Sequence, residues 1–293
     1  MASFGSCLRG RRVGSWLAMM LLATTLAQAQ VPGVPDTTEP QVHVPGGGSI
    51  GARELASMAA NPAAPVTLIQ LRDVLLPDIS GASGAGNALQ LQPTLPIGPF
   101  PHFKVIQLVK ISLSYVTTPD PDGASGLGDM QLFDLFTNKV SWGRWGYGVA
   151  FVFPTASSTS LGQGKWQAGP AIAIIYSGTK HLTAGAVFQN PISFAGSPDR
   201  PAVSSLILTP TLTYSFHGGW FAGMSDFNWS YDWYNSSATI PVGVQVGKII
   251  QMGRRPVSLS IEAGGTVVRP SGTPYPGWIV GIEFTPIFRW HID

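Results

Sequence analysis

Seven charged side chains stand on strand-like segments, opposite apolar faces. They are Lys104, Lys110, Asp226, Asp232, Glu262, Glu283 and Arg289. Because successive side chains of a strand point to opposite sides, these charges face away from the apolar side. If the apolar sides meet lipid, the charges line a lumen. They then form either a polar path or binding cleft for a solute, or internal salt bridges that fill a narrow barrel. The sequence leaves both interpretations open.

Other residues of catalytic or metal-binding type show no comparable order. The five histidines, His43, His102, His181, His217 and His291, are scattered and lack the spacing of metal ligands. A lipid hydrolase would need a serine, a histidine and an orienting polar group together. Serines are abundant and His217 is available, but no G-x-S-x-G motif selects a nucleophile. We therefore expect no enzyme, no cofactor and no metal, and keep a barrel-embedded lipid-modifying hydrolase as an alternative.

The segment 278–292 shows the alternation most clearly. Its odd positions include Glu283, Thr285, Arg289 and His291, whereas every even position is apolar: Trp278, Val280, Ile282, Phe284, Pro286, Phe288, Trp290 and Ile292. A tilted strand of about 9–11 residues crosses a bilayer, so the segment is long enough. Its apolar face ends in aromatic residues, as strands do at a membrane–water interface.

Composition supports a membrane environment. The chain has 293 residues, enough for one large all-β domain. Only 11% of residues are charged, against a usual share of about 25%. Mean hydropathy is +0.20. The net charge of +2, without a basic cluster in the body of the chain, gives no indication of nucleic-acid binding.

Residues 1–29 have the pattern of a cleaved signal peptide. Arg9, Arg11 and Arg12 precede a short apolar run, and Ala27-Gln28-Ala29 forms a small-x-small cleavage site. Cleavage would remove Cys7, the single cysteine, so the mature chain would contain no thiol. After residue 29 no apolar run reaches 18 residues. A β-barrel is then the structure that satisfies its backbone in lipid.

Strand-like segments separated by turn clusters fill most of the remaining sequence. We expect 30–65 to be a flexible periplasmic segment with a short helix at 50–60, and 66–293 to be the barrel domain. The clear strands are 87–97, 103–115, 127–140, 147–153, 166–176, 182–194, 206–216, 227–233, 240–246, 257–267 and 278–292. Segment 66–76 alternates poorly because Arg72-Asp73 interrupts it, and counting it gives twelve strands. Bacterial barrels usually have an even number.

A secreted β-sandwich would also show alternating strands, with the apolar faces turned to a core. Two features favour the barrel. Apolar faces rich in Phe, Trp and Tyr recur on nearly every strand, and the opposite faces carry small polar residues instead of the Lys and Glu of a solvated surface. We predict an all-β fold, a transmembrane antiparallel up-and-down β-barrel of about 12 strands (10–12).

Several segments, in order, resemble a family of bacterial outer-membrane proteins often mislabelled as neuromedin U. This family is related to the transporter family associated with meta-pathway phenol degradation. The matching pieces are Asn61-Pro62-Ala63-Ala64-Pro65, Leu91-Gln92-Pro93, Gly126-Leu127-Gly128-Asp129, Phe153-Pro154-Thr155-Ala156, the run 161–170, Tyr231-Asp232-Trp233, Pro241-Val242-Gly243, Gly247-Lys248 and Arg255-Pro256-Val257. The resemblance covers about residues 61–290. It implies an outer-membrane barrel that transports small solutes, hydrophobic or aromatic compounds among them, and it supplies no catalytic residues.

The main hypothesis is a passive outer-membrane transporter or channel, porin-like, in a bacterium. The alternatives are a structural or adhesive barrel with a filled lumen and the hydrolase described above. Expected partners are membrane lipid and lipopolysaccharide, the outer-membrane insertion machinery and a small-molecule solute, with no nucleic acid. The chain departs from the usual barrel ending, since His291-Ile292-Asp293 follow the aromatic Trp290.

Overall fold

The computed structural model describes residues 39–44, 48–99, 105–121, 123–270 and 274–288. The predicted signal peptide, the start of segment 30–65 and the tail 289–293 lie outside these ranges, as do Lys104 and Arg289. Within the described part, no helix has the length and apolar character needed to cross a membrane.

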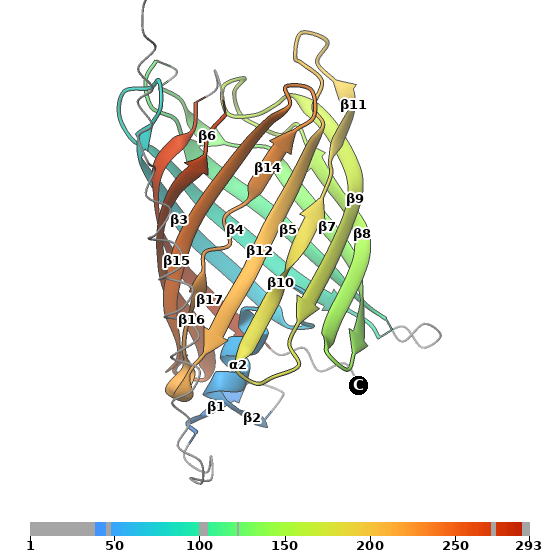
Figure 1. Cartoon of the computed structure of the whole chain (residues 1–293), viewed down its shortest axis with the longest axis vertical. Coiled ribbons are helices and arrows are strands. Elements are labelled where there is room, and N and C mark those ends of the chain that lie inside the picture. Colours follow the sequence, from blue (N-terminus) through green and yellow to red (C-terminus); the bar gives the residue numbers. More distant parts are fainter. Residues whose placement is uncertain (1–38, 45–47, 100–104, 122, 271–273, 289–293) are drawn as a thin grey trace, which may run out of the picture. The chain divides into compact units, whose positions relative to one another are not determined.

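The strands of the main sheet form one closed antiparallel barrel with twelve strand positions (Figure 1). Nine positions hold one strand each: β3 (Thr67–Ile79), β4 (Gly86–Ile97), β5 (Ile106–Thr117), β8 (Gly143–Phe153), β9 (Lys165–Tyr176), β12 (Ser205–Ser215), β15 (Ser237–Met252), β16 (Arg255–Val268) and β17 (Pro276–Phe288). The ring closes because β17 pairs with β3 and β9 pairs with β10 (Leu182–Gln189). The predicted fold class is confirmed, and segment 66–76 is a barrel strand.

Each of the three remaining positions is divided into two strands. They are β6 (Ser125–Leu127) with β7 (Met130–Val140), β10 with β11 (Ile192–Gly196), and β13 (Trp220–Met224) with β14 (Trp229–Asp232). Both members of each pair contact a common neighbour: β5 for the first, β9 for the second, and β12 and β15 for the third. The predicted segment 227–233 therefore covers only the second half of its strand position.

Since β3 begins and β17 ends at the same end of the barrel, we call this the termini end and the opposite one the loop end. Turns at the termini end include the two-residue connection 141–142 and the short 3-10 helix η1 (His217–Gly219). The longest connection, 154–164, lies at the loop end. It is fixed there, because Asp129 Oδ1 accepts a hydrogen bond from Ala156 N (3.1 Å) and Asp129 Oδ2 one from Gln163 N (2.7 Å).

The outer face is apolar. Its large exposed side chains include Leu71 on β3, Ile261 on β16 (64% exposed) and Ile282 on β17 (62%). Exposed aromatic side chains gather toward both ends. They are Trp142, Trp145, Tyr147, Tyr176, Phe216 and Trp220 toward the termini end, and Tyr115, Trp166, Phe194, Trp233, Tyr234 and Trp278 toward the loop end. The alternation predicted for β17 is confirmed, since its even positions point outward.

Basic side chains accompany the aromatic residues of the termini end. Lys248 Nζ lies 4.8 Å from the ring centroid of Trp220, and Arg255 Cζ lies 4.7 Å from that of Phe288. Two carboxylates also share the outer side of their strands. Asp73 accepts a hydrogen bond from Asn87 Nδ2 (2.7 Å), and Asp134 accepts one from Gln107 Nε2 (2.9 Å). The outer face therefore combines an apolar band, aromatic ends and few charges, each with a nearby partner.

A folded N-terminal unit packs at the termini end. It consists of β1 (Gln41–Val44), β2 (Gly48–Gly51), the helix α2 (Ala52–Ala59) and the segment 60–66 that leads to β3. The helix follows from its alanine-rich sequence, and Ala52, Leu55 and Ala56 form one buried face at helical spacing. This face joins a hydrophobic cluster with Val42 and Val44 of the unit and with Phe221, Ile249 and Ile287 of the barrel.

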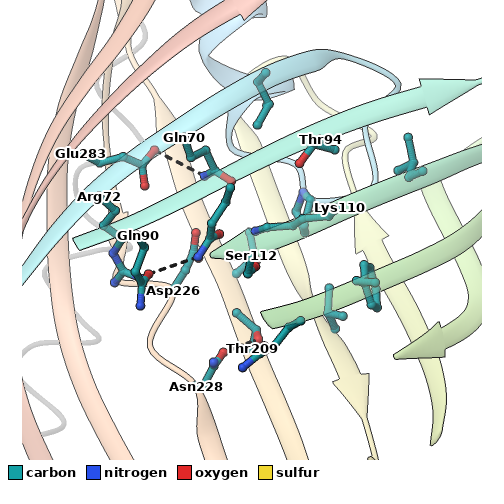
Figure 2. A pocket seen from close by; sticks show the side chains of 18 of the residues that line it. Gln70, Arg72, Gln90, Thr94, Lys110, Ser112, Thr209, Asp226, Asn228 and Glu283 are labelled. Atoms are coloured by element: carbon teal, nitrogen blue, oxygen red, sulfur yellow. Dashed lines mark hydrogen bonds between the residues drawn. The ribbon is translucent and has the colours of Figure 1, made fainter. Parts of the chain in front are cut away.

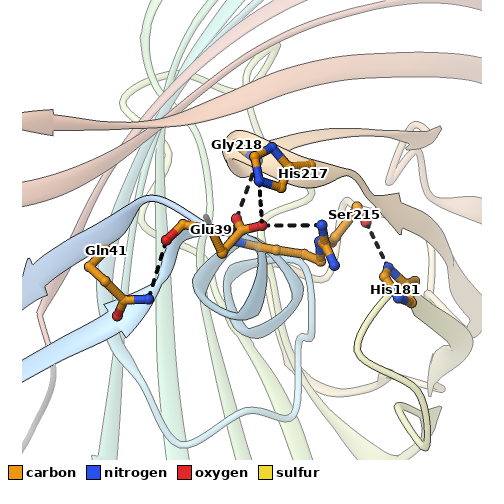
Figure 3. Close-up of polar contacts among 7 residues, drawn as sticks. Glu39, Gln41, His181, Ser215, His217 and Gly218 are labelled. Carbon is orange, nitrogen blue, oxygen red and sulfur yellow. Dashed lines mark hydrogen bonds and ion pairs between the residues drawn. The ribbon is translucent and has the colours of Figure 1, made fainter. Parts of the chain in front are cut away.

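Polar contacts also bind this unit to the barrel (Figure 3). Glu39 pairs with Arg53 Nη2 (3.1 Å) and accepts hydrogen bonds from Arg53 N (3.0 Å) and Gly218 N (3.2 Å). The hydroxyls of Ser57 on α2 and Thr183 on β10 lie 3.1 Å apart. The expected helix at 50–60 is confirmed. Segment 30–65 was expected to be flexible, and the apolar side chains of its described residues 42, 44, 50, 52, 55, 56 and 64 pack against the barrel.

Shortening Leu55 should loosen the N-terminal unit. Its side chain is 2% exposed, and removal of a buried leucine side chain costs about 2–5 kcal/mol. We expect Leu55→Ala to increase hydrogen exchange of residues 41–60 while the barrel strands stay protected. Glu54→Ala on the exposed side of the same helix is the matched control. Equal protection of 41–60 in both variants would contradict the packing described.

Candidate lumenal site

A cavity of about 260 Å³ lies inside the barrel. Its lining comes from nearly all sides of the wall and from the end of the N-terminal unit. Figure 2 shows side chains of β3, β4, β5 and β12 and of the segment 225–228 pointing into it. The polar, uncharged lining residues are Gln70, Gln90, Gln92, Thr94, Ser112, Ser114, Gln131, Gln189, Thr209, Thr211, Asn228 and Gln245, with Asn61 from the N-terminal unit. Amide and hydroxyl groups therefore line the cavity together with apolar side chains such as Leu68, Leu132 and Phe133.

Arg72 on β3 organises the charges on one side of the cavity. It faces Glu283, its register partner on β17, and its guanidinium reaches across β17 to Glu262 on β16. Arg72 Nε donates to Glu262 Oε1 (2.6 Å), and Nη2 forms an ion pair with the same oxygen. A side chain at position 281 would collide with Glu262, so Gly281 is what lets this carboxylate lie against the wall.

Glu283 has neutral hydrogen-bond donors. Its Oε1 accepts hydrogen bonds from Thr285 Oγ1 (2.7 Å) and from Gln70 Nε2 (3.4 Å). Both donors lie on the inner wall beside it, Thr285 on the same strand and Gln70 on β3. The carboxylate is thereby held in place at the edge of the cavity (Figure 2).

The segment 225–228, between β13 and β14, leaves the wall and enters the lumen. Phe227 is 5% exposed and packs with Val74 of β3 and Ile279 of β17. In the order of the barrel strands, β15 and β16 lie between these two strands and β13. Its ring also lies 5.7 Å from Arg72 Cζ. There is room for the ring because Gly243 and Gly264 carry no side chains: an added Cβ at either would lie within 2.8 Å of Phe227 Cε2.

Asp226 is carried into the lumen with Phe227. Its carboxylate lines the cavity, and its Oδ1 is buried and accepts no hydrogen bond from the described residues. Lys110 faces the same cavity from β5. Its Nζ makes no hydrogen bond, and no ion pair within 4.0 Å, to any residue in the described ranges.

Residues of the N-terminal unit border the cavity toward the termini end. The residues Ala59, Ala60, Asn61, Pro62 and Ala64 line the cavity at that end. Beside them, Leu108, Leu135, Ala173 and Val187 form a buried apolar cluster on the inner wall of β5, β7, β9 and β10. The cavity is therefore a chamber inside the barrel that the N-terminal unit borders on one side.

The structure brings four of the seven predicted residues together. Lys110, Asp226, Glu262 and Glu283 line one cavity, whereas Lys104 and Arg289 lie outside the described ranges. Asp232 differs from the prediction. Its carboxylate accepts hydrogen bonds from Tyr234 N (2.9 Å), Asn235 N (3.1 Å) and Asn235 Nδ2 (2.8 Å), so it stabilises the turn between β14 and β15 and does not line the cavity.

Sequence reasoning missed Arg72, the central cation, and misplaced Phe227. Arg72 looked like an interruption of a poor strand, although it stands between Gln70 and Val74 on the inner side of β3. Glu262 on β16, which pairs with this inward arginine, is far away in the sequence, so the local pattern does not reveal the pair. Phe227 has the alternate spacing of one aromatic face with Trp229, Tyr231 and Trp233 in the predicted strand 227–233. It points inward because the regular strand begins only at Trp229.

The histidines in the described ranges do not contact a serine hydroxyl. His217 Nε2 lies 3.6 Å from Glu39 Oε2, and His181 Nδ1 lies 3.4 Å from the backbone oxygen of Ser215 (Figure 3). A serine hydrolase needs the histidine to take the proton of the nucleophilic hydroxyl. Among the described residues, no group of three or more His, Cys, Asp or Glu side chains is arranged to hold a metal ion.

No family model matches the chain, and no curated protein is significantly similar in sequence. A solved structure has a similar fold. It is an outer membrane channel of Pseudomonas putida F1, with a TM-score of 0.53 over 76% of this chain and 94% of that chain. The sequences are 10% identical, so the similarity establishes the barrel fold and leaves the function to be argued from the site.

Breaking the pair between Arg72 and Glu262 should destabilise the barrel. The side chains are 17% and 10% exposed, and removal of one partner of a buried pair costs about 3–5 kcal/mol. We expect Glu262→Gln to lower the urea midpoint of unfolding in detergent. The double variant Arg72→Met, Glu262→Met should lose less stability because no charge stays unpaired. If the double variant has a lower urea midpoint than Glu262→Gln, the result would contradict this pairing.

Proposed function

We propose that this chain is a bacterial outer-membrane β-barrel that acts as a passive channel for small solutes. One observation supports the proposal above all others. The closed barrel has its apolar side chains outside and a polar, charged chamber inside, the inverse of a water-soluble protein. A closed barrel leaves no unpaired strand edge in hydrocarbon, and its lumen isolates a polar path from lipid.

The ends of the barrel also support a position across a bilayer. Exposed aromatic residues toward both ends, with Lys248 and Arg255 beside aromatic rings at the termini end, match the interfaces of a bilayer. The longest connection lies at the loop end, which we place outside the cell. The termini end, with the N-terminal unit, would then face the periplasm.

The chamber favours polar solutes over the hydrophobic or aromatic compounds that the family resemblance implies. Amide, hydroxyl and charged groups predominate among its lining residues, and they can replace part of the hydration shell of a polar solute. A small hydrophobic molecule would have to displace water from these groups without replacing the hydrogen bonds. We therefore propose passage of small hydrophilic solutes along their gradient.

The alternative of a structural barrel with a filled lumen is favoured by one feature. The N-terminal unit and the cluster around Leu108 border the chamber toward the termini end. If the barrel is a channel, residues 59–66 must move for a solute to pass. Nothing comparable favours the hydrolase, since neither His181 nor His217 contacts a serine hydroxyl.

Transport is tested with purified protein in liposomes. We expect liposomes that contain the barrel to swell in isotonic glycerol faster than empty liposomes, while sucrose at the same osmolarity gives little swelling because the chamber is narrow. Swelling rates equal to those of empty liposomes would contradict the channel and favour the filled barrel.

A disulfide provides the matched control for the proposed movement. The hydroxyls of Ser57 and Thr183 lie 3.1 Å apart, and a disulfide places two sulfurs about 2.05 Å apart. The variant with Ser57→Cys and Thr183→Cys should swell slowly when oxidised and at the wild-type rate after reduction. Each single variant should be insensitive to reduction. Fast swelling of the oxidised variant would show that the N-terminal unit need not move.

The membrane orientation gives a separate prediction. Ile261 is exposed at the middle of β16, and a lysine on the lipid face near the bilayer midplane costs about 2–4 kcal/mol. Ile261→Lys should therefore reduce the yield of folded protein in lipid vesicles, with Ile261→Leu as the control. If Ile261→Lys folds as well as Ile261→Leu in vesicles, this face does not meet lipid.

A further inference from the structure

The charges around the chamber do not balance. Of the described residues that line it, Asp129, Asp226, Glu262 and Glu283 are acidic, and Arg72 and Lys110 are basic. Electrostatic interactions are stronger in a confined space of low dielectric than in bulk water. The excess of negative charge therefore acts on any ion that enters.

Three of the four carboxylates already have hydrogen-bond donors. Glu262 is held by the guanidinium of Arg72, Glu283 by Thr285 and Gln70, and Asp129 by two backbone N–H groups at the loop end. Asp226 differs from them, because its buried Oδ1 accepts no hydrogen bond from the described protein atoms.

The basic residues leave Asp226 incompletely neutralised. Arg72 is bound to Glu262. Lys110 lines the same chamber as Glu283 and Asp226 and makes no ion pair within 4.0 Å with either. One ammonium group thus faces two carboxylates. A buried carboxylate without a direct partner is costly, and a second cation beside it would lower that cost.

The neighbours of Asp226 can complete a cation site. Asn228, two residues along the same inward segment, and Thr209 on β12 also line the chamber (Figure 2). Gln245 lines it from β15. Thr209 Oγ1 donates to Asn228 Oδ1 (2.6 Å), which fixes the Asn228 side chain. Amide and hydroxyl oxygens are suited to replace water around an ammonium group or an alkali cation.

We propose that the chamber is a binding site for small monovalent cations, primary ammonium compounds in particular, and that Asp226 is its main selectivity determinant. Lys110 opposes this selectivity by compensating part of the negative charge. The expected effect of this site on ion selectivity rests on the proposed channel function. Cation binding in the chamber does not depend on that function.

The selectivity is measured as a reversal potential in planar bilayers under a KCl gradient. We expect wild-type protein to favour K⁺ over Cl⁻ by more than about three-fold, because the net charge of the chamber is negative. Asp226→Asn should bring the ratio close to one, Lys110→Met should raise it, and Asp226→Glu should preserve it. Asp73→Asn, which removes a carboxylate from the outer face, is the matched control and should leave the ratio unchanged.

Binding is measured independently of conduction. Calorimetric titration of the detergent-solubilised protein should detect butylammonium binding and no binding of propionate or propionamide, which are similar in size. Asp226→Asn should abolish the butylammonium signal, and Asp73→Asn should retain it. Anion selectivity, unchanged selectivity in Asp226→Asn, or equal binding of the three compounds would overturn the inference. Butylammonium binding without conductance would refute only the channel.

Discussion

The pairing of the last barrel strand with the first is the constraint on which the rest of this structure depends. β17 and β3 carry the ends of the barrel sequence, and their ladder leaves neither with an unpaired edge. In hydrocarbon each unsatisfied backbone group costs several kcal/mol, so an open sheet would not be stable there. The same ladder places Arg72 next to Glu283. Closure and the charge arrangement of the chamber thus depend on one strand register.

Long side chains can enter the lumen because parts of the inner wall have none. Gly281 leaves space for the carboxylate of Glu262, and Gly243 and Gly264 leave space for the ring of Phe227. Both of these inward groups therefore lie over glycines of nearby strands. This complementarity lets a narrow barrel contain an ion pair, an inward segment of the wall and a chamber at the same time.

The sequence was sufficient for the fold because strand alternation is a local property. Trp278 to Phe288 could be assigned to outward and inward faces from period two alone, and the structure confirms that assignment. Lys110, Glu262 and Glu283 were assigned inward by the same argument, and they line the chamber.

Local pattern was not sufficient where the backbone departs from a regular strand or where a partner is distant. Phe227 has the spacing of an outward aromatic residue, and no neighbour in sequence reveals that the wall is interrupted before Trp229. Asp232 has the sequence spacing of an inward residue, but its carboxylate accepts hydrogen bonds from the backbone of the following turn. The place of Arg72 depends on Glu262, which is almost two hundred residues away, so the pair appears only when the barrel closes.

The interruption between β13 and β14 affects how such a protein can change in evolution. In a regular barrel the diameter follows from strand number and stagger, and an inserted residue shifts the register of a whole strand. Residues 225–228 lie between two short ladders that are anchored separately. Insertions or deletions there can alter the width of the lumen without moving β12 or β15. The width of the lumen can therefore change with the length of this segment, while the surrounding strands keep their register.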